Sequence, residues 1–477
     1  MSDHSHPRWS CVGIATLLAI GLGAQVALHL LEPPLAITWS YAHLWRHPEL
    51  GWLGAVLAIA LPAATMLVWR QPAMARSLGA VRGRRVLAGT ACVLVALGVV
   101  SLRYPSHPTA IDPPLYVMAI SRGEVNPRHH LTTWLLGRLA GALKGWITAT
   151  TLLLAMNALY GTVTYVALAA SARLLGRTRG EAMAIALLAG TAFGTVQMSF
   201  GNLNNSRSLA VALLSVFCWT AIRAVTGDGH PVWPFVIGFV GIFWYQGLVL
   251  LIPSLPVVAV EVLRRPEGRR QLATAGVVAV VAAGLATLPV YARPFAWSAF
   301  LRDAYASSIC GVGDPLPSCT LPLSHIATAH HVVEVLNVWL LVDGVGILLV
   351  AVTGTWLALS LLRRRTWDPA AAVLATVAAG FFAFTITNYN PFGNFANWDV
   401  YGYGAPVTAL LGGYAFVTWG RECQASSRWL LGLGLAAAAI HLLARLNTMH
   451  LDLRRHMAET PAPAAAPART LGGASGA

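Results

Sequence analysis

Charged residues are scarce in this chain. Asp, Glu, Lys and Arg together make up 10% of its 477 residues, whereas hydrophobic residues make up 56% and the mean hydropathy is +0.63. In a soluble globular domain about a quarter of the residues are charged. The composition therefore excludes an ordinary soluble domain and indicates an integral membrane protein.

Apolar runs near the length needed to cross a bilayer, about 20 residues, recur along the chain. They lie at about 10–31, 51–69, 86–102, 147–172, 182–199, 208–225, 232–245, 247–263, 272–291, 335–361, 369–387, 404–419 and 429–446. They lack the alternation of a membrane β-barrel, and backbone polar groups in lipid must be satisfied within each segment. We predict an all-α polytopic bundle of about 13 spans.

The predicted organisation is a single transmembrane domain followed by a tail. Residues 1–455 hold all of the apolar runs, and the first run has no convincing cleavage site, so we expect it to be retained as a span. Residues 456–477 are rich in Ala, Pro and Gly, a composition typical of disorder.

Acidic residues are fewer than basic ones, and the formal net charge is +14. The arginines lie in short loops between apolar runs, which favours membrane topology over nucleic-acid binding as their explanation. Threading the spans through the bilayer puts the basic loops at 70–85, 173–180, 264–270 and 363–367 on one face. A cytoplasmic N-terminus makes that face cytoplasmic, and the long polar segments then lie outside, at 32–50, 103–146, 292–334 and 388–403.

Cysteine is also rare, with six in the chain. Cys11, Cys92, Cys218 and Cys423 lie in or beside apolar runs, where a cysteine is usually a small buried apolar residue. Cys310 and Cys319 instead flank "GVGDPLPS" in a predicted outer loop, so we expect a disulfide between them. Two thiols without CxxC spacing do not predict a metal site.

The outer segment 103–146 contains the acid of greatest interest. Pro105, Pro108, Pro113 and Pro114 surround Asp112, and the pattern at about 115–121 and 131–143 predicts short amphipathic helices along the membrane surface. Such a loop holds its polar residues at headgroup depth: Asp112, Glu124, His129 and His130. The alternative for Asp112 is a helix cap with Pro113 at the first helical position.

Three further outer segments carry candidate binding residues. In "FGNLNNSR", Asn204 and Arg207 precede a span, and an arginine near a helix N-terminus makes a plausible anion site. The "WYQG" hairpin holds Gln246, while its Trp244 and Tyr245 are better explained as an aromatic belt at the membrane interface. The last candidates lie in the two late outer segments: His325, Trp398 and Asp399.

Several sequence motifs follow one another in a definite order along the chain. They are "NPRHHLTTWLLGRL" after the loop aspartate, a "GN" turn, "WYQGLVLLIPSLP", "LSHIATAHHVVEVLNVWLL" and "NFANWDVYGYGAPVTALL". The series, over roughly 105–411, resembles bacterial polytopic glycosyltransferases of the GT-C type, which use polyprenyl-phosphate sugars, and in particular the branch with a late Trp-Asp motif. The sequence departs from the simplest plan of that family, in which the aspartate loop follows the first span, because two more apolar runs precede the loop here. It also lacks an Asp-x-Asp motif.

The resemblance implies a function and a set of roles. It implies transfer of a sugar from a polyprenyl-phosphate donor to an envelope glycan, lipid or protein on the outer face of the bacterial cytoplasmic membrane, with inversion. Asp112 matches the first-loop acid and is expected to act as general base, and Trp398 with Asp399 matches the late motif that shapes the sugar site. No metal ligand is assigned, and dependence on a divalent cation stays an open alternative.

Two rival functions remain at this level. A lipid or small-solute transporter or flippase typically places ionisable groups at the bilayer midplane, and Asp343 in "LLVDGVG" is the acid that lies clearly inside an apolar run. A non-catalytic scaffold does not account for polar residues concentrated in one set of loops. Asp399 itself has the simpler reading of an interfacial helix cap beside an aromatic anchor.

Overall fold

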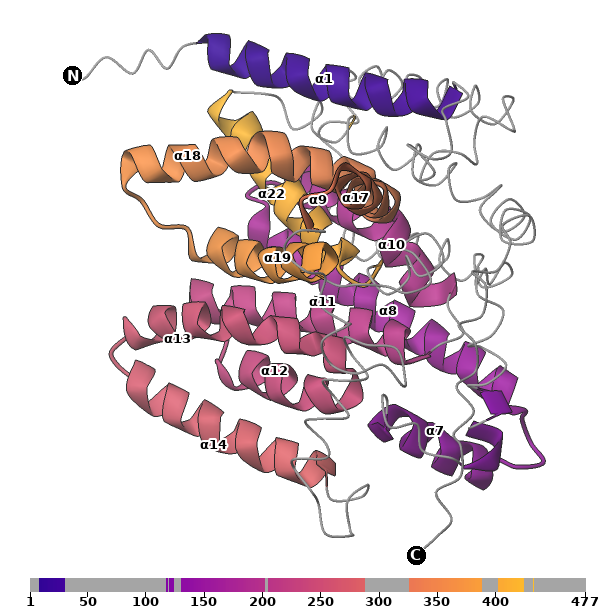
Figure 1. Ribbon diagram of the computed structural model, residues 1–477. Helices are drawn as coiled ribbons and strands as arrows, with labels where there is room; N and C mark the ends of the chain where they lie inside the picture. Colours follow the sequence, from indigo (N-terminus) through magenta and orange to yellow (C-terminus); the bar gives the residue numbers. More distant parts are fainter. Residues whose placement is uncertain are drawn as a thin grey trace, which may run out of the picture.

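A computed structural model describes residues 8–30, 117–118, 120–123, 130–201, 205–287, 326–387, 402–423 and 432. Within these ranges the chain is helical and contains no strand, as the sequence predicts (Figure 1). The predicted runs at 51–69 and 86–102, and nearly all of 429–446, lie outside the described residues.

Most helices coincide with the predicted apolar runs. The elements of the first half are α1 (Arg8–Leu30), α7 (His130–Ala142), α8 (Ala149–Leu175), α9 (Arg179–Thr191), α10 (Phe193–Val196), the π-helix η2 (Gln197–Gly201) and α11 (Asn205–Thr226). Those of the second half are α12 (Val232–Trp244), the 3-10 helix η3 (Gln246–Ser254), α13 (Leu255–Leu263), α14 (Gly268–Thr287), α17 (Ala329–Leu349), the π-helix η5 (Val350–Gly354), α18 (Thr355–Arg364), α19 (Pro369–Thr387) and α22 (Ala405–Glu422).

Membrane-spanning capacity can be judged only for the described helices. Four are long and apolar enough to cross a bilayer: Ala149–Leu175, Arg207–Thr226, Ala329–Arg364 and Pro369–Thr387. A fifth is added if the bent pair Arg179–Thr191 and Phe193–Phe200 counts as one span. The structure thus supports a helical membrane protein, whereas the predicted count of about 13 spans is not confirmed.

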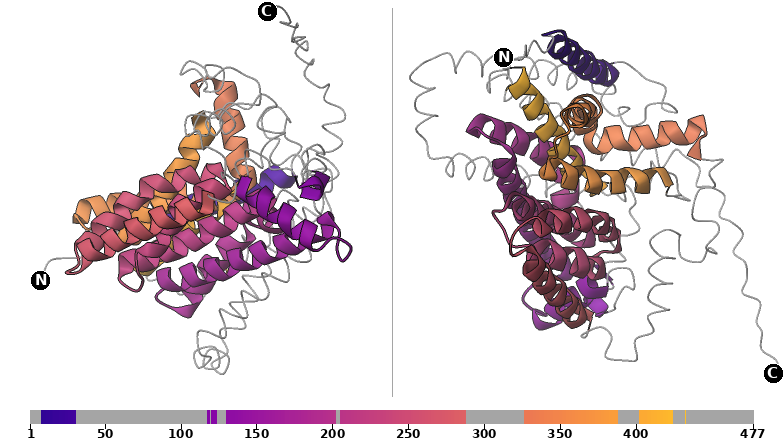
Figure 2. Two further views of the ribbon diagram at one scale, coloured as in Figure 1. Left: turned by 90° about the horizontal axis from the view of Figure 1, so that it is seen from below. Right: turned by 90° about the vertical axis from the view of Figure 1, so that its left-hand side faces the viewer.

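The bundle is organised around α11 and α22. Helix α11 packs on α8, α12 and α19, α12 packs on α14, and α22 packs on α9, α17 and α19. One apolar core with fully buried residues such as Leu214, Phe217 and Leu410 runs through these contacts. Helix α1 lies at the edge of the molecule, far from α14 (Figures 1 and 2).

Two helices of this bundle are interrupted in their apolar interiors. The predicted run at 182–199 bends by 67° between α9 and α10, where Ala192 has non-helical φ and ψ of −50° and 131°. Helix α17 is broken at Asp343, whose φ and ψ are −160° and 64°. In Figure 1, α18 lies across the view, whereas α17 is seen nearly end-on. The two breaks are neighbours, because a Cβ on Gly194 would lie 2.9 Å from Val342 Cγ1 and 2.7 Å from the Gly402 carbonyl.

Polar contacts join three of the predicted basic loops at one end of the bundle. Arg421 donates to the Leu175 carbonyl and pairs with Glu181 at 2.7 Å, beside the loop at 173–180. The Trp367 indole donates to Glu261 at 2.5 Å and Arg265 donates to the Ala224 carbonyl, which connects the loops at 363–367 and 264–270. We call this the basic end. The fourth predicted loop, 70–85, lies outside the described residues.

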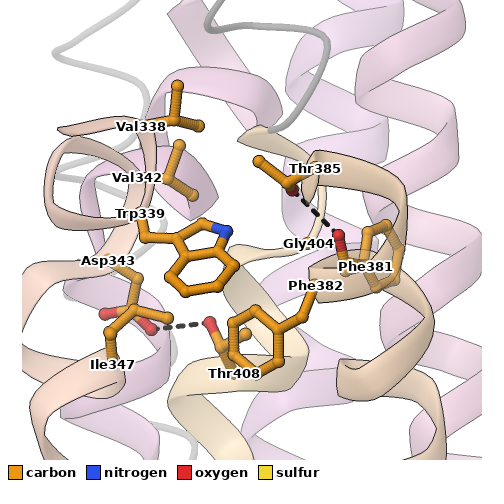
Figure 3. Close-up of a pocket in the computed structure, with 10 residues that line it drawn as sticks. All are labelled: Val338, Trp339, Val342, Asp343, Ile347, Phe381, Phe382, Thr385, Gly404 and Thr408. Carbon is orange, nitrogen blue, oxygen red and sulfur yellow. Dashed lines mark hydrogen bonds between the residues drawn. The ribbon is translucent and has the colours of Figure 1, made fainter. Parts of the chain in front are cut away.

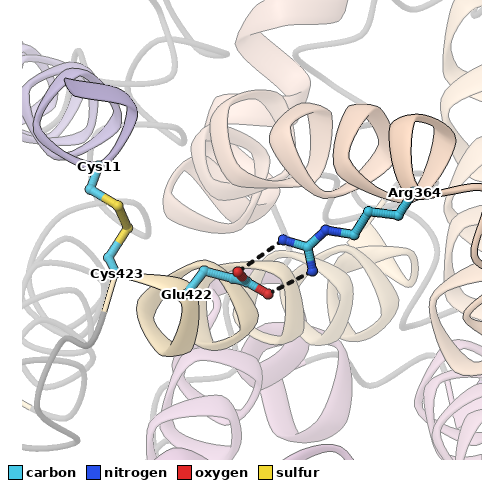
Figure 4. The surroundings of a disulfide bond; sticks show 4 residues. All are labelled: Cys11, Arg364, Glu422 and Cys423. Carbon is cyan, nitrogen blue, oxygen red and sulfur yellow. Dashed lines mark hydrogen bonds and ion pairs between the residues drawn. A yellow bond between two sulfur atoms is a disulfide. The ribbon is translucent and has the colours of Figure 1, made fainter. Parts of the chain in front are cut away.

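A disulfide at the basic end corrects one sequence prediction. Cys11 of α1 is bonded to Cys423, directly after α22, with Cα atoms 5.7 Å apart, next to the ion pair of Arg364 and Glu422 (Figure 4). Their interpretation as small buried apolar residues was wrong, because a separation of 412 residues in sequence hides their proximity. Cys218 is buried and unbonded, as expected.

Thiol alkylation checks both cysteine pairs. In protein purified and then denatured without reductant, we expect intact mass to show two alkylated thiols, those of Cys92 and Cys218. Cys11 and Cys423 are bonded, and Cys310 and Cys319, which lie outside the described residues, are predicted to be bonded. A disulfide persists only in an oxidising compartment. If the basic end is cytoplasmic, Cys11 and Cys423 should therefore be reduced and open to alkylation in intact cells. A disulfide between them in intact cells would instead reverse the predicted orientation.

Close packing of η2 on α8 gives a stability prediction. A Cβ on Gly161 would overlap the ring of Phe200, which is 1% exposed and stacks on Tyr165 at 5.5 Å. Because this ring has little room to move, Gly161→Ala should lower the free energy of unfolding by roughly 1–3 kcal/mol. Gly276→Ala in α14 meets nothing within 4 Å and is the matched control. Equal melting temperatures in detergent for both variants would contradict the packing argument.

Candidate functional site

A buried arginine lies at the end of the bundle opposite the basic end. Arg207, in the first turns of α11, is 8% exposed, and its guanidinium is hydrogen-bonded to the hydroxyl of Tyr245, the residue that ends α12. Ala224, which contacts the basic end, is about 25 Å further along the same helix at 1.5 Å per residue. Arg207, predicted from the sequence as part of an anion site, is therefore a cation at the end of the bundle that is predicted to be the outer one.

Aromatic rings form one wall beside Arg207. Tyr245 meets Tyr403 edge to face at 5.2 Å between ring centroids, and Tyr403 meets Phe381 at 4.9 Å. Gly247 makes this approach possible, because a Cβ there would lie 2.5 Å from both Tyr245 Cε1 and the Tyr403 hydroxyl. We call Arg207, Tyr245 and Tyr403 the arginine cluster.

The described part of the predicted first outer loop packs near this cluster. The predicted amphipathic helix at 131–143 is found as α7, and residues 117–118 and 120–122 are helical as well. Thr132 of α7 donates to the carbonyl of Trp244, the residue before Tyr245, at 3.2 Å. Leu136 and Ile120 pack with Leu152 and Leu153 of α8. Helix α7, which begins at His130, therefore docks at the arginine cluster's end of the bundle.

Of the predicted site residues, Arg207 is the one whose side chain the structure describes. His130 begins α7 and Gln246 begins η3, but their side chains lie outside the described set. The others lie wholly outside it: Asp112, Glu124, His129, Asn204, Cys310, Cys319, His325, Trp398 and Asp399. In sequence, Asn204 is three residues before Arg207 and Asp399 is four residues before Tyr403.

The structure changes the interpretation of two tyrosines. Tyr245 was expected in an aromatic belt facing the membrane interface, but it is 8% exposed and bonded to Arg207. Tyr403, 1% exposed, was not singled out at all. The usable signal was a glycine within two residues of each tyrosine, Gly247 and Gly402, since small residues in tight turns often allow a close approach.

The chemistry of the arginine cluster suits an oxyanion. A guanidinium offers up to five N–H donors in a planar fork that matches phosphate or carboxylate, and it keeps its charge when buried. The adjoining tyrosine rings make the surroundings of the guanidinium apolar and aromatic, as in sites that hold sugar rings and prenyl units. Among the described residues no three His, Cys, Asp or Glu gather to hold a metal ion.

A narrow crevice lies on the other side of the aromatic wall (Figure 3). It is lined by Phe381, Phe382 and Thr385 of α19, Gly404 and Thr408 near the start of α22, and Val338, Trp339, Val342, Asp343 and Ile347 of α17 and its break. Its empty space is about 290 Å³, of which about 20 Å³ admits the centre of a water molecule. It is therefore large enough for one or two waters and too small for a sugar.

Asp343 lies at one end of this crevice and is 1% exposed. Its Oδ1 accepts from the Gly346 N–H at 3.0 Å and its Oδ2 accepts from the Thr408 hydroxyl at 2.8 Å. The first contact is that of an N-cap on the helix that resumes after the break. The indole N–H of Trp339 lines the same crevice, and no acceptor lies within reach of it in the part of the chain that the structure describes.

Phe381 connects the arginine cluster to the crevice, since it lines the crevice and packs on Tyr403.

Comparison with known proteins assigns the chain to no family: no family model matches it, and no curated protein is similar to it.

Proposed function

We propose that this chain is an integral membrane glycosyltransferase of the GT-C type. It moves a sugar from a polyprenyl-phosphate donor to an envelope glycan, lipid or protein acceptor on the outer face of a bacterial cytoplasmic membrane. The arginine cluster is the observation that carries the proposal, because it sets a buried cation against an aromatic wall at the end opposite the basic loops.

The donor's chemistry accounts for this placement. A polyprenyl-phosphate sugar keeps its tail in the bilayer and its phosphate at the headgroup level, so the site needs a cation at the end of the bundle beside an apolar wall. Arg207 stabilises the phosphate as it leaves the sugar carbon. The proposal also assigns Asp112, Trp398 and Asp399 to the site, on the basis of their sequence positions. Asp112 belongs to the predicted outer loop that ends in α7, and Trp398 and Asp399 lie a few residues before Tyr403.

The proposed reaction is a single displacement. Asp112 accepts the proton of the acceptor hydroxyl as its oxygen attacks the sugar carbon, the carbon–oxygen bond to the lipid phosphate breaks, and the configuration at that carbon inverts. The phosphate leaves with the bonding electron pair and is held by Arg207. The released polyprenyl phosphate stays in the membrane.

A comparison of a deletion strain with its parent tests this function. We expect one glycan, glycolipid or glycoprotein of the envelope to lose a sugar, while the polyprenyl-phosphate sugar accumulates because its consumer is gone. An unchanged set of glycoconjugates would reject glycosyl transfer.

A second candidate, a transporter or flippase, rests on a separate observation. Asp343 interrupts α17 beside the break at Ala192, and adjacent broken helices around a buried acid are a common arrangement in transporters. In the same deletion strain this candidate predicts intact glycan structures with a lipid or solute retained on one side of the membrane. The two functions thus give different results in one comparison.

A further inference from the structure

The carboxyl of Asp343 has hydrogen-bond partners but no counter-charge among the described residues. The elements packed around it offer neutral groups: the Thr408 hydroxyl from α22, Phe381 and Phe382 from α19, and Gln25 of α1, whose amide donates to the Gly344 carbonyl at 2.9 Å. On α17 itself, the nearest titratable residues, Glu334 and His331, are nine and twelve residues away, and His331 is bonded to the Ile386 carbonyl.

An uncompensated carboxylate inside a membrane bundle is costly, because it loses its hydration and gains no paired charge. The cap on Gly346 explains why a side-chain oxygen is present, but a serine or asparagine caps equally well without a charge. A proton removes the charge, and the crevice is too poor in oxygen ligands to hold a metal cation instead.

Thr408 can serve the carboxyl in both of its states. Its Oγ1 is 2.8 Å from Asp343 Oδ2 and also 3.0 Å from the carbonyl of Ala405. When Asp343 is ionised, the hydroxyl donates to Oδ2. When Asp343 is protonated, Oδ2–H donates to Thr408 Oγ1, and the hydroxyl proton turns to the Ala405 carbonyl. The hydrogen bond between Asp343 Oδ2 and Thr408 Oγ1 is kept in both states, and only the hydroxyl proton changes its direction, so exchange costs little reorganisation.

We propose that Asp343 is a reversible proton-binding site in the interior of the bundle, with Thr408 as the hydroxyl that accommodates both states. The crevice is the path to it: water-sized space adjoins Asp343, Trp339 and Thr385, and the Trp339 N–H, which has no acceptor among the described residues, offers a donor to a water there. Figure 3 shows the indole between Asp343 and Thr385. The site goes beyond glycosyl transfer and does not depend on it.

Infrared difference spectroscopy on the purified full-length protein in detergent tests the proposal. A protonated carboxyl has a C=O stretch that a carboxylate lacks. Above about pH 6, where exposed Asp and Glu are ionised, we expect one such band to appear and disappear reversibly up to about pH 9 and to be missing in Asp343→Asn. This variant keeps the size and capping ability of the residue. Thr408→Val should shift the band, because the partner of Oδ2 is lost.

Asp228→Asn is the matched control, since Asp228 is exposed and bonded to Thr226 at the loop after α11. It should leave the band unchanged. A spectrum in which no buried-carboxyl band titrates, or in which the band survives Asp343→Asn, overturns the proposal and leaves Asp343 as a static helix cap. Loss of the band in Asp343→Asn, together with unchanged envelope glycans in the deletion strain, would support the proton site while rejecting glycosyl transfer.

Discussion

Asp112→Asn is expected to reduce glycosyl transfer by roughly 100-fold or more while the protein is made and folds normally. The amide keeps the size of the side chain and its ability to cap a helix, but it cannot take the proton of the acceptor hydroxyl. Transfer is measured in membranes as incorporation of sugar into the glycoconjugate that the deletion strain lacks.

The alternative role of Asp112 makes a different prediction. A helix cap lost on substitution costs about 1 kcal/mol of stability, and asparagine is itself a good cap, so a capping role leaves transfer nearly unchanged. Parental activity in Asp112→Asn therefore assigns the residue a structural role, and Glu124 or Asp399 becomes the candidate base. Normal activity in Glu124→Gln alongside a loss in Asp112→Asn supports the present assignment.

Arg207→Gln should lower kcat/KM for transfer by roughly 100-fold or more, because it removes the cation that stabilises the leaving phosphate. Arg207→Lys keeps the charge but loses the planar fork of donors, so an intermediate loss is expected. Tyr245→Phe retains the ring that packs on Tyr403 and removes only the hydroxyl bonded to Arg207. In Tyr245→Phe, kcat/KM should fall less, by about 10-fold, the size expected from one hydrogen bond to a charged group.

Arg223→Gln is the matched control for Arg207, since it removes an arginine from the other end of the same helix. Arg223 donates to the Asp228 carbonyl at 2.6 Å near the basic end and lies over the Trp219 ring. It should leave transfer unchanged. Equal activity in Arg207→Gln and Arg223→Gln, with both proteins folded, would contradict the proposed phosphate site.

Helix positions were largely predictable because each depends on a local property. Apolar runs predicted α8 and α19 within a few residues. The π-helix η2 and the break at Ala192 were not predictable, since no proline or charged residue marks either of them. Contacts across the bundle decide such interruptions, here the packing of Phe200 on Gly161 and of Gly194 on α22.

The sequence by itself determined that this is a helical membrane protein, because a bilayer imposes a length and a composition on each segment that reaches across it. It also indicated that the arginine loops gather at one end, since charge sorts to one side along the chain. Only the tertiary structure decided that Tyr245 and Tyr403 meet beside Arg207, that Cys11 reaches Cys423, and that Asp343 faces Thr408. These partners are distant in the chain, and what brings them together is side-chain packing between helices, which local composition does not encode.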